Sequence, residues 1–479
     1  MKLFSFLPVL GLVAASQMPL KDATSLSTSS GPSFSHSSDF TVLTHGDHPD
    51  HKISIKNHDS SDAVCDGATK GYSGYLSISD WKHFYFYYFD SRKDPVVDPL
   101  ILWLNGGPGC SSMMGLFLEL GPCRVNEHGN GTYSNPSSWI EEASVFFLDQ
   151  PIGVGYSYAD KGHGIEANGT FAASEDIYAF MQIWYKTFPE SRSRPFHIAG
   201  ESYGGHYIPI FAKHIVDENA KVKQEDTIPL ESIMIGNGMF DPLRQLTSSW
   251  DITCTNVTGI GPILSETVCA EMSTHIPRCE KLWKAAYDYE DNLIGEVAKD
   301  YCWTNLEGPY ERSGYNYYDV SKLCIGVMCY AEVDQIDKYL NSKFVRERLG
   351  IPEEFQRYEG CSEKVGRAYE AVGDMYYPTT GEVAALLNGG LRVLMYVGTY
   401  DWICNFVGNE RWLDALEWRG RFGYRHAARY EQKPWMGGET WEYENLRYAR
   451  VAGAGHMVPW DKPKEALHMV KAWLKNEKL

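Results

Sequence analysis

The stretch Gly200-Glu-Ser-Tyr-Gly204 holds a serine in the G-x-S-x-G spacing of a nucleophile elbow, in which a strand turns sharply into a helix. The apolar run 195–199 precedes it and a helix-like pattern follows. In such a turn the serine hydroxyl is exposed in a cleft, and we expect Gly200 and Gly204 to be needed because the turn leaves no room for side chains. Five-residue matches arise by chance in a chain with 44 glycines, so Ser202 needs downstream partners before it becomes a candidate nucleophile.

A serine hydroxyl needs a general base, and in an α/β-hydrolase the acid and the histidine follow the serine in that order, each after a strand. Asp401 follows the apolar run 391–397, and His456 follows the run 446–452. Either residue alone is more often a loop hydrogen-bonding group, but three such residues after three expected strands favour catalysis. We expect His456 to take the proton of Ser202, and Asp401 to fix the imidazole tautomer.

A tetrahedral oxyanion needs backbone N–H donors as well. We expect one from Tyr203, the residue after the nucleophile, and one from the loop Asn105-Gly-Gly-Pro108, which follows the buried run 100–104. Gly107 is our choice in that loop, because a side chain there would crowd the approaching carbonyl. The alternative interpretation of the loop is a plain Gly-Pro turn.

Strands that alternate with helices predict an α/β-hydrolase fold with a doubly wound, mostly parallel sheet. The alternation breaks over 241–330, where six cysteines and helical fragments predict an inserted, disulfide-stapled cap. We therefore expect a core formed by residues 63–240 and 331–479. The expected strands of this core are 72–78, 83–89, 100–104, 145–148, 195–199, 230–236, 391–398 and 446–452. Its expected helices are 113–120, 172–188, 405–418 and 463–475.

The N-terminus has the outline of a secretory signal peptide over residues 1–16, with Lys2 before an apolar run and small residues after it. Residues 17–62 are rich in Ser, Thr, His and Asp, which predicts a flexible leader or short pro-segment. No later apolar run reaches the roughly 18 residues of a membrane span, so we expect no membrane partner. Secretion is the expected location, and a vacuolar or lysosome-like acidic compartment is the alternative.

Composition narrows the partners further. The chain has 479 residues and a net charge of −18, which argues against nucleic acid as a partner. Its 11 cysteines suit an oxidising compartment, and their spacing lacks a C-x-x-C zinc pattern, so we expect no metal and no other cofactor. The aromatic content of 14% suits core and lid packing or, alternatively, an aromatic-lined pocket. Sequons for glycosylation occur at Asn130, Asn168 and Asn256.

Taken together, these residues resemble the serine carboxypeptidases of the fungal carboxypeptidase Y type. The matching stretches are Leu104-Asn-Gly-Gly-Pro-Gly-Cys-Ser-Ser112, Phe117-Leu-Glu-Leu-Gly-Pro122, Leu148-Asp-Gln-Pro151, Gly200-Glu-Ser-Tyr-Gly-Gly-His-Tyr-Ile-Pro209, Ile235-Gly-Asn-Gly238, Asp401-Trp-Ile-Cys-Asn405 and Gly455-His-Met-Val-Pro459. The resemblance implies release of single amino acids from the C-termini of peptides and proteins. It also implies that Asn105, Glu119 and Glu201 bind the terminal carboxylate, and that Cys404 and Met457 line the substrate pocket.

Carboxyl groups can bind a carboxylate only if protons are shared among them. Glu201 beside Glu119 in a closed pocket is therefore expected to have a raised pKa, which predicts activity favoured at acidic pH. The alternative for Glu201 is a surface residue that merely tolerates the elbow. Cys404 is not expected to be a nucleophile, because no second base is placed for it.

The resemblance also implies disulfides. The pairs carried over are Cys110–Cys361, Cys254–Cys269, Cys279–Cys302 and Cys324–Cys329. The chain lacks one cap pair of that type and has Cys65 and Cys123 in addition, so we infer that these two bond each other, a feature that resembles the secreted fungal enzymes. The missing pair leaves substrate preference open.

Rival functions remain at this point. An acyltransferase or lyase could reuse the same triad, and a protective or scaffold protein could carry it silently.

Overall fold

The structure, a computed structural model, describes residues 27–28, 40–45, 48–58, 64–160, 163, 169–353, 355 and 357–479. The expected signal peptide, residues 1–16, and the sequon at Asn168 lie outside the described residues.

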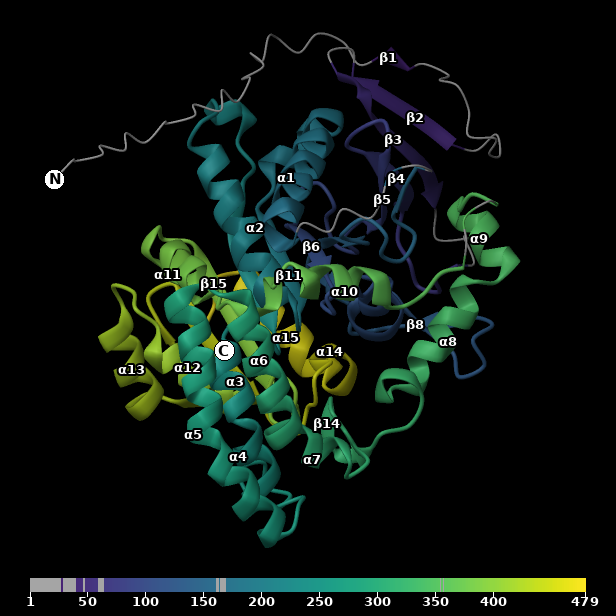
Figure 1. The fold of residues 1–479 in the computed structure, drawn as a ribbon. Coiled ribbons are helices and arrows are strands. Elements are labelled where there is room, and N and C mark those ends of the chain that lie inside the picture. The colour runs from purple at the N-terminus through teal and green to yellow at the C-terminus, as the bar shows by residue number, and fades with distance from the viewer. Residues whose placement is uncertain are drawn as a thin grey trace, which may run out of the picture.

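A large sheet runs through the molecule, and its central strands are parallel (Figure 1). Their apolar runs are buried on both faces, as parallel strands covered by helices require. In spatial order they are β9 (Ser144–Leu148), β6 (Leu100–Leu104), β11 (Phe196–Glu201), β12 (Leu230–Gly236), β15 (Arg392–Gly398) and β18 (Leu446–Val451). The strand that leads to Ser202, β11, therefore lies in the interior of the sheet.

Antiparallel strands extend the sheet at both edges. β5 (Lys82–Phe89) pairs with β9 and, as the expected hairpin, with β4 (Gly71–Ser77). At the other edge, β17 (Gly438–Tyr443) and β16 (Lys433–Trp435) form a hairpin beside β18. Shorter strands are β10 (Tyr158–Ala159), which pairs with β5, and the pair β7 (Cys123–Val125) and β8 (Thr132–Ser134).

Residues 17–62 are expected to be a flexible leader or a short pro-segment. Flexibility is wrong for the strands of its later part, and the pro-segment stays a prediction. β3 (His48–His58) pairs with β4 from Lys52 to His58 and also with β2 (Phe40–His45), which in turn pairs with β1 (Ser27–Thr28). Ile53 and Ile55 are 1% and 4% exposed and belong to the main core. The run Lys52-Ile-Ser-Ile-Lys56 does alternate as a strand does, but it lies in a polar segment, and burial against β4 decides its structure.

Alternate side chains of β6 show how both faces of the sheet are covered. Leu100, Leu102 and Leu104 enter the core on one face, and Ile101 and Trp103 enter the core on the other. Helices outside the segment 241–330 with residues in the first core are α1 (Gly169–Thr187), α2 (Gly204–Asn219), α10 (Glu363–Ala371), α11 (Thr380–Asn388), α12 (Phe406–Ala415) and α13 (Arg421–Tyr430). Those in the second are η1 (Gly115–Leu120), α8 (Ala331–Leu340), α9 (Lys343–Leu349), α14 (Val458–Asp461) and α15 (Pro463–Leu474).

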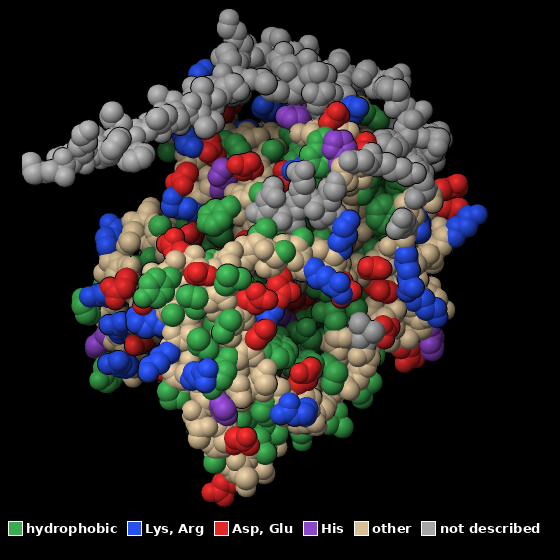
Figure 2. Space-filling view, viewed as in Figure 1, with side chains coloured by type: hydrophobic (Ala, Val, Ile, Leu, Met, Phe, Trp, Pro, Cys, Tyr) green, Lys and Arg blue, Asp and Glu red, His purple; other side chains and the backbone are tan. Residues whose placement is uncertain are grey.

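The segment between β12 and α8 folds as a helical layer of its own, which lies in the lower part of Figure 1. We call it the cap. Its elements are α3 (Pro242–Thr247), α4 (Ser249–Cys254), α5 (Glu266–Tyr289), α6 (Asn292–Cys302), η5 (Trp303–Glu307), α7 (Gly308–Glu311), β13 (Tyr315–Asn316) and β14 (Asp319–Leu323). Met272, Trp283 and Leu306 belong to a small separate core there. Figure 2 shows a hollow lined by hydrophobic side chains near the centre of the same face.

Disulfides form between all the cysteine pairs that were expected, which confirms that part of the prediction. They are Cys65–Cys123, Cys110–Cys361, Cys254–Cys269, Cys279–Cys302 and Cys324–Cys329. Three of them staple the cap, whose own core is small, and Cys404 is left as a buried thiol. In the part of the chain that the structure describes, no helix is long and apolar enough to cross a membrane.

Short turns of helix connect these elements. They are η2 (Trp139–Glu141), η3 (Pro189–Ser193), η4 (Gln224–Asp226), η6 (Val327–Cys329) and η7 (Asp374–Tyr376).

The burial of β3 yields a stability prediction. Ile53→Ala should lower the free energy of unfolding by about 3 kcal/mol, because it leaves a cavity in the main core. Asn57→Ala, an exposed position on the same strand, is the matched control and should change it by less than about 0.5 kcal/mol. Urea unfolding of the purified protein measures both, and equal effects of the two substitutions would show that β3 is not part of the cooperative core.

Candidate active site

Ser202 lies where β11 ends and α2 begins, in a backbone conformation that a serine rarely adopts, with φ of 59°. Its N–H donates to the carbonyl oxygens of Gly236 and Asn237, each at 3.1 Å, and its own carbonyl accepts from the Met239 N–H at 2.9 Å. These hydrogen bonds from the end of β12 and the loop after it therefore fix the strained turn at Ser202. Strain of this kind persists only where neighbouring structure fixes it, and it is common at functional sites.

The glycines around Ser202 are needed for reasons that differ in part from the expectation. A Cβ on Gly200 would lie 2.2 Å from the Leu104 carbonyl oxygen, so β6 and β11 demand glycine there. A Cβ on Gly204 would meet Ile208 Cδ1 at 3.5 Å and the Leu104 carbonyl oxygen at 3.8 Å, both ordinary contacts, so the expectation of crowding at Gly204 is wrong. Gly205 is the crowded position, because a Cβ there would lie 2.5 Å from the Met239 carbonyl oxygen.

Asp401 and His456 meet in space although they follow different strands. His456 Nδ1 lies 2.9 Å from Asp401 Oδ2, and both side chains are buried. The N–H of Ile403 donates to Asp401 Oδ1 at 3.2 Å, and the N–H of His456 donates to the carbonyl of Tyr318 in the cap at 2.7 Å. The carboxylate therefore fixes one ring nitrogen, and the cap fixes the backbone of the histidine.

Asn237 is a site residue to which the sequence reasoning assigned no role. Its Nδ2 donates to Asp401 Oδ2 at 2.7 Å, and its own N–H donates to the Tyr396 carbonyl at 2.8 Å. The side chain thus gives Asp401 a second donor besides His456. The signal was present in Ile235-Gly-Asn-Gly238, an Asn between two glycines after a strand, but only the neighbouring strands reveal its partner.

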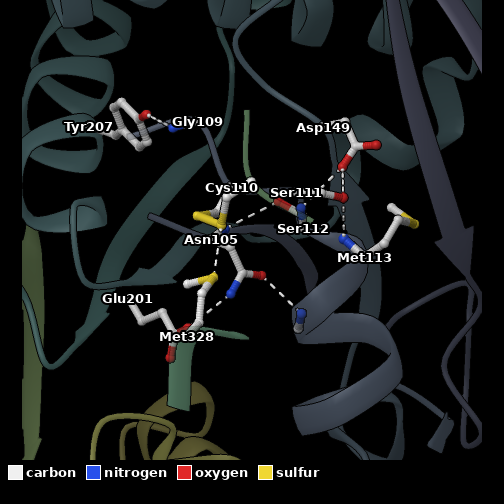
Figure 3. The surroundings of a disulfide bond; sticks show 12 residues. Asn105, Gly109, Cys110, Ser111, Ser112, Met113, Asp149, Glu201, Tyr207 and Met328 are labelled. Atoms are coloured by element: carbon white, nitrogen blue, oxygen red, sulfur yellow. Dashed lines mark hydrogen bonds between the residues drawn. A yellow bond between two sulfur atoms is a disulfide. The ribbon is translucent and has the colours of Figure 1, made fainter. Parts of the chain in front are cut away.

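The loop 105–112 is organised by a buried carboxylate, Asp149 (Figure 3). Asp149 Oδ1 accepts from Ser111 Oγ at 2.6 Å and from the Ser112 N–H at 3.1 Å, and Oδ2 accepts from the Tyr156 N–H at 2.9 Å. Burial raises the pKa of Asp149 to about 7, although these donors favour its charged form. Ser112 Oγ then accepts from the Asn105 N–H at 3.2 Å, which links Asp149 to the start of the loop.

The loop presses directly against the elbow. A Cβ on Gly106 would lie 2.4 Å from the Tyr203 nitrogen and 2.7 Å from Ser202 Cβ, so these backbones are in contact. Gly107 adopts φ of 114°, and a Cβ there would meet the nitrogens of Gly109 and Cys110 at 2.6 and 2.7 Å. Glycine is therefore required at 107 by the loop itself, a reason different from the expected crowding of a carbonyl.

Asn105, Glu119 and Glu201 come together beside the elbow, as the resemblance implied. Asn105 Nδ2 donates to Glu201 Oε1 at 2.8 Å and lies 3.4 Å from Glu119 Oε1. The amide is held in this orientation because its Oδ1 accepts from Trp103 Nε1 at 2.8 Å and from the Gly115 N–H at 2.9 Å. All three side chains are buried, and we call them the carboxyl cluster.

Burial sets the protonation of this cluster. It raises the pKa of Glu119 to about 7, against hydrogen bonds from Glu201 and Asn105 that lower it. It raises the pKa of Glu201 well above its ordinary value, and the charge of Glu119 raises it further. Two carboxyls this close share protons at acidic pH, so the cluster can donate hydrogen bonds to an anion there.

Cys404 and Met457 are both buried, and they lie in sequence close to Asp401 and His456 respectively. Burial raises the pKa of the Cys404 thiol, and the charges of Asp401 and Glu201 raise it further, so Cys404 is held as a thiol. Ligand-type atoms of Asp401, Cys404 and His456 lie within 4.8 Å of one another, but two of these residues already share a hydrogen bond. Farther away, Asn130 and Asn256 are exposed on the surface.

Comparison with known proteins gives a consistent result. A profile of the serine carboxypeptidase family matches residues 65–476. Carboxypeptidase Y of Komagataella phaffii is 40% identical over 465 residues, covering 94% of this chain and 86% of that protein. Carboxypeptidase Y of Candida albicans is 41% identical over 436 residues, covering 90% of this chain and 77% of that protein.

A solved structure agrees on the fold. Kex1Δp, a prohormone-processing carboxypeptidase from Saccharomyces cerevisiae, superposes with a TM-score of 0.74 at 24% identity, covering 87% of this chain and 92% of that one. The mostly parallel sheet, with Ser202, Asp401 and His456 each following one of its strands, is thus the α/β-hydrolase fold. With the family profile matched across nearly the whole described core, the chain belongs to the serine carboxypeptidase family.

Proposed function

We propose that this protein releases single amino acids from the C-termini of peptides and proteins by a Ser-His-Asp acyl-enzyme mechanism favoured at acidic pH. The observation that carries the proposal is the place of Glu201. It directly precedes Ser202, and its Oε1 accepts from Asn105 Nδ2 at 2.8 Å. A group that can hold a carboxylate therefore lies one residue from the nucleophile, which suits cleavage next to a free C-terminus.

In the first half of the reaction, Ser202 Oγ attacks the scissile carbonyl carbon while His456 takes the hydroxyl proton. The C–N bond then breaks, and His456 returns the proton to the leaving amine. Asp401, which has donors in both His456 and Asn237, keeps the imidazole oriented and stabilises its cation. Water repeats the sequence on the acyl-enzyme and releases the shortened peptide.

The oxyanion of each tetrahedral intermediate is proposed to bind the N–H groups of Tyr203 and Gly107. Contact between Gly106 and the elbow brings these two backbone segments together. Asp149 holds the loop through Ser111 and Ser112, so the donors are already in place before charge develops.

Recognition of the terminal carboxylate is proposed to use the carboxyl cluster, with Cys404 and Met457 lining the pocket. The pKa of Glu119, raised to about 7 by burial, sets the pH range. Below that pH the cluster is neutral and donates to the substrate carboxylate, whereas above it a negative charge on Glu119 repels the substrate. An acyltransferase or a lyase needs no such cluster beside its serine.

The cellular location of the protein is a proposal, with secretion and an acidic vacuole as the two candidates. A vacuolar serine-type carboxypeptidase of Saccharomyces cerevisiae is 40% identical over 446 residues, covering 91% of this chain and 85% of that protein. That likeness favours the vacuolar alternative over secretion, and the raised pKa values of Glu119 and Glu201 suit an acidic vacuole.

Hydrolysis of an N-blocked dipeptide and of its C-terminal amide tests the activity. We expect release from the free acid to exceed release from the amide below about pH 6, and an organofluorophosphate to abolish both by labelling Ser202. Ser202→Ala should lower kcat by at least about 10⁴-fold without changing the melting temperature. Labelling of Ser202 without turnover of either substrate, measured by chromatography of the products, would refute the proposal.

The pH dependence has a separate test in Glu119→Gln. The preference for the free acid over the amide should fall in the wild type around pH 7, as Glu119 ionises. Gln is neutral at every pH, so this fall should move to higher pH in the variant, while the amide profile stays the same. The ratio of kcat/KM values between about pH 4 and pH 9 measures it, and an unchanged midpoint would mean that Glu119 does not set the limit.

A further inference from the structure

Glu307, at the end of η5 in the cap, is a buried carboxyl with nothing to satisfy it. The residue is 2% exposed, and neither carboxyl oxygen has a hydrogen-bond partner among the described residues. A buried acid normally has a hydrogen bond or a counter-charge, since an unpaired one destabilises the fold. Such a group calls for a partner that arrives from outside the chain.

The helical segment that carries Glu307 continues directly into α7, which contacts the catalytic loop. Tyr310, three residues on, stacks on Trp402 with ring centroids 4.4 Å apart and planes 10° from parallel. Glu307 directly precedes α7, so it lies within about one helical turn of Tyr310. Trp402 directly follows Asp401. Leu306, by contrast, packs into the core of the cap.

Electrostatics connects Glu307 with a buried thiol of the site as well. Its charge contributes to raising the pKa of the Cys404 thiol, after the larger effects of burial, Asp401 and Glu201, whereas an interaction with Ser202 lowers that pKa. Burial raises the pKa of Glu307 itself to about 8, with a further increase from the charge of Glu311. No Lys or Arg of the described residues is paired with Glu307, and the charged neighbour that shifts its pKa, Glu311, is an acid.

We propose that Glu307 is a specificity-determining residue that receives the basic side chain, lysine or arginine, of the substrate residue on the acyl side of the scissile bond. The proposal rests on the proposed function. The C-terminal residue of the substrate is proposed to bind at the carboxyl cluster, at the ends of β6 and β11. The substrate residue on the acyl side is then expected on the other side of Ser202, toward the cap. A cation is the fitting occupant, because Glu307, Glu311 and Asp401 would attract it and repel an acidic side chain.

The test compares N-blocked dipeptides in which the acyl-side residue is lysine or norleucine, with leucine as the leaving residue. The two residues share their aliphatic chain, and only lysine carries an ammonium group. Glu307 is protonated at about pH 6 in the free protein, but an ammonium group placed beside it favours its ionised form. We therefore expect the wild type to favour lysine by about tenfold in kcat/KM at this pH, the range for a hydrogen bond to a charged group. Glu307→Leu should remove this preference, and Glu307→Gln should reduce it at least threefold.

Glu311→Gln is the matched control, because it removes an exposed charge one turn away, and it should keep the lysine preference within about twofold. Glu307→Leu should also raise the melting temperature, since it replaces an unpaired buried acid with an apolar side chain. An unchanged lysine-to-norleucine ratio in Glu307→Leu would overturn the proposal, as would a response seen only when the basic residue is the leaving one. Turnover of the norleucine peptide by the wild type reports separately on the proposed function.

Discussion

The parallel register of β6, β11 and β12 is the constraint on which the site depends. Leu104 pairs with Gly200, and Glu201 pairs with Gly236, so all three strands end at the same level. The carboxyl ends of parallel strands meet at one edge of a sheet, which brings the residues that follow each strand together. Asn105, Ser202 and Asn237 are therefore neighbours because of backbone pairing, before any of their side chains interact. β15 and β18 add Asp401 and His456 by the same rule.

Buried acids are the second theme, and they connect stability with the working environment. Burial raises the folded pKa of Glu119 and Asp149 to about 7 and that of Glu307 to about 8. A carboxyl whose pKa is raised on folding keeps its proton in the folded state at pH values where the unfolded chain has lost it. Its contribution to the free energy of unfolding therefore falls as the pH rises from the unfolded-state pKa of about 4 toward the folded-state pKa. The same protons that let the carboxyl cluster bind a carboxylate thus make the fold more stable in acid.

Much of this architecture can be predicted from the sequence, because continuous apolar runs identify the buried parallel strands and fix the order Ser202, Asp401, His456. The disulfides followed from the family resemblance and not from spacing. What escaped prediction depends on contacts between distant segments. β3 alternates weakly inside a polar stretch, and Gly205 is crowded only by Met239 of another loop. The partners of Asn237 and Asp149 lie on neighbouring loops. Glu307 likewise lacks hydrogen-bond partners because of the residues around it in the fold. In the sequence it is indistinguishable from an ordinary acidic residue of a helix.

The late position of β18 has a consequence for biosynthesis. A nascent chain that already carries Ser202 on a folded β11 still lacks Asp401 and His456, because both follow strands that are synthesised much later. Until β15 and β18 add to the sheet, the serine has neither base nor oriented acid, and its hydroxyl is no better a nucleophile than that of free serine. The linear order of the strands therefore delays proteolytic competence until β15 and β18 have been synthesised, and a shorter nascent polypeptide cannot digest its neighbours during folding.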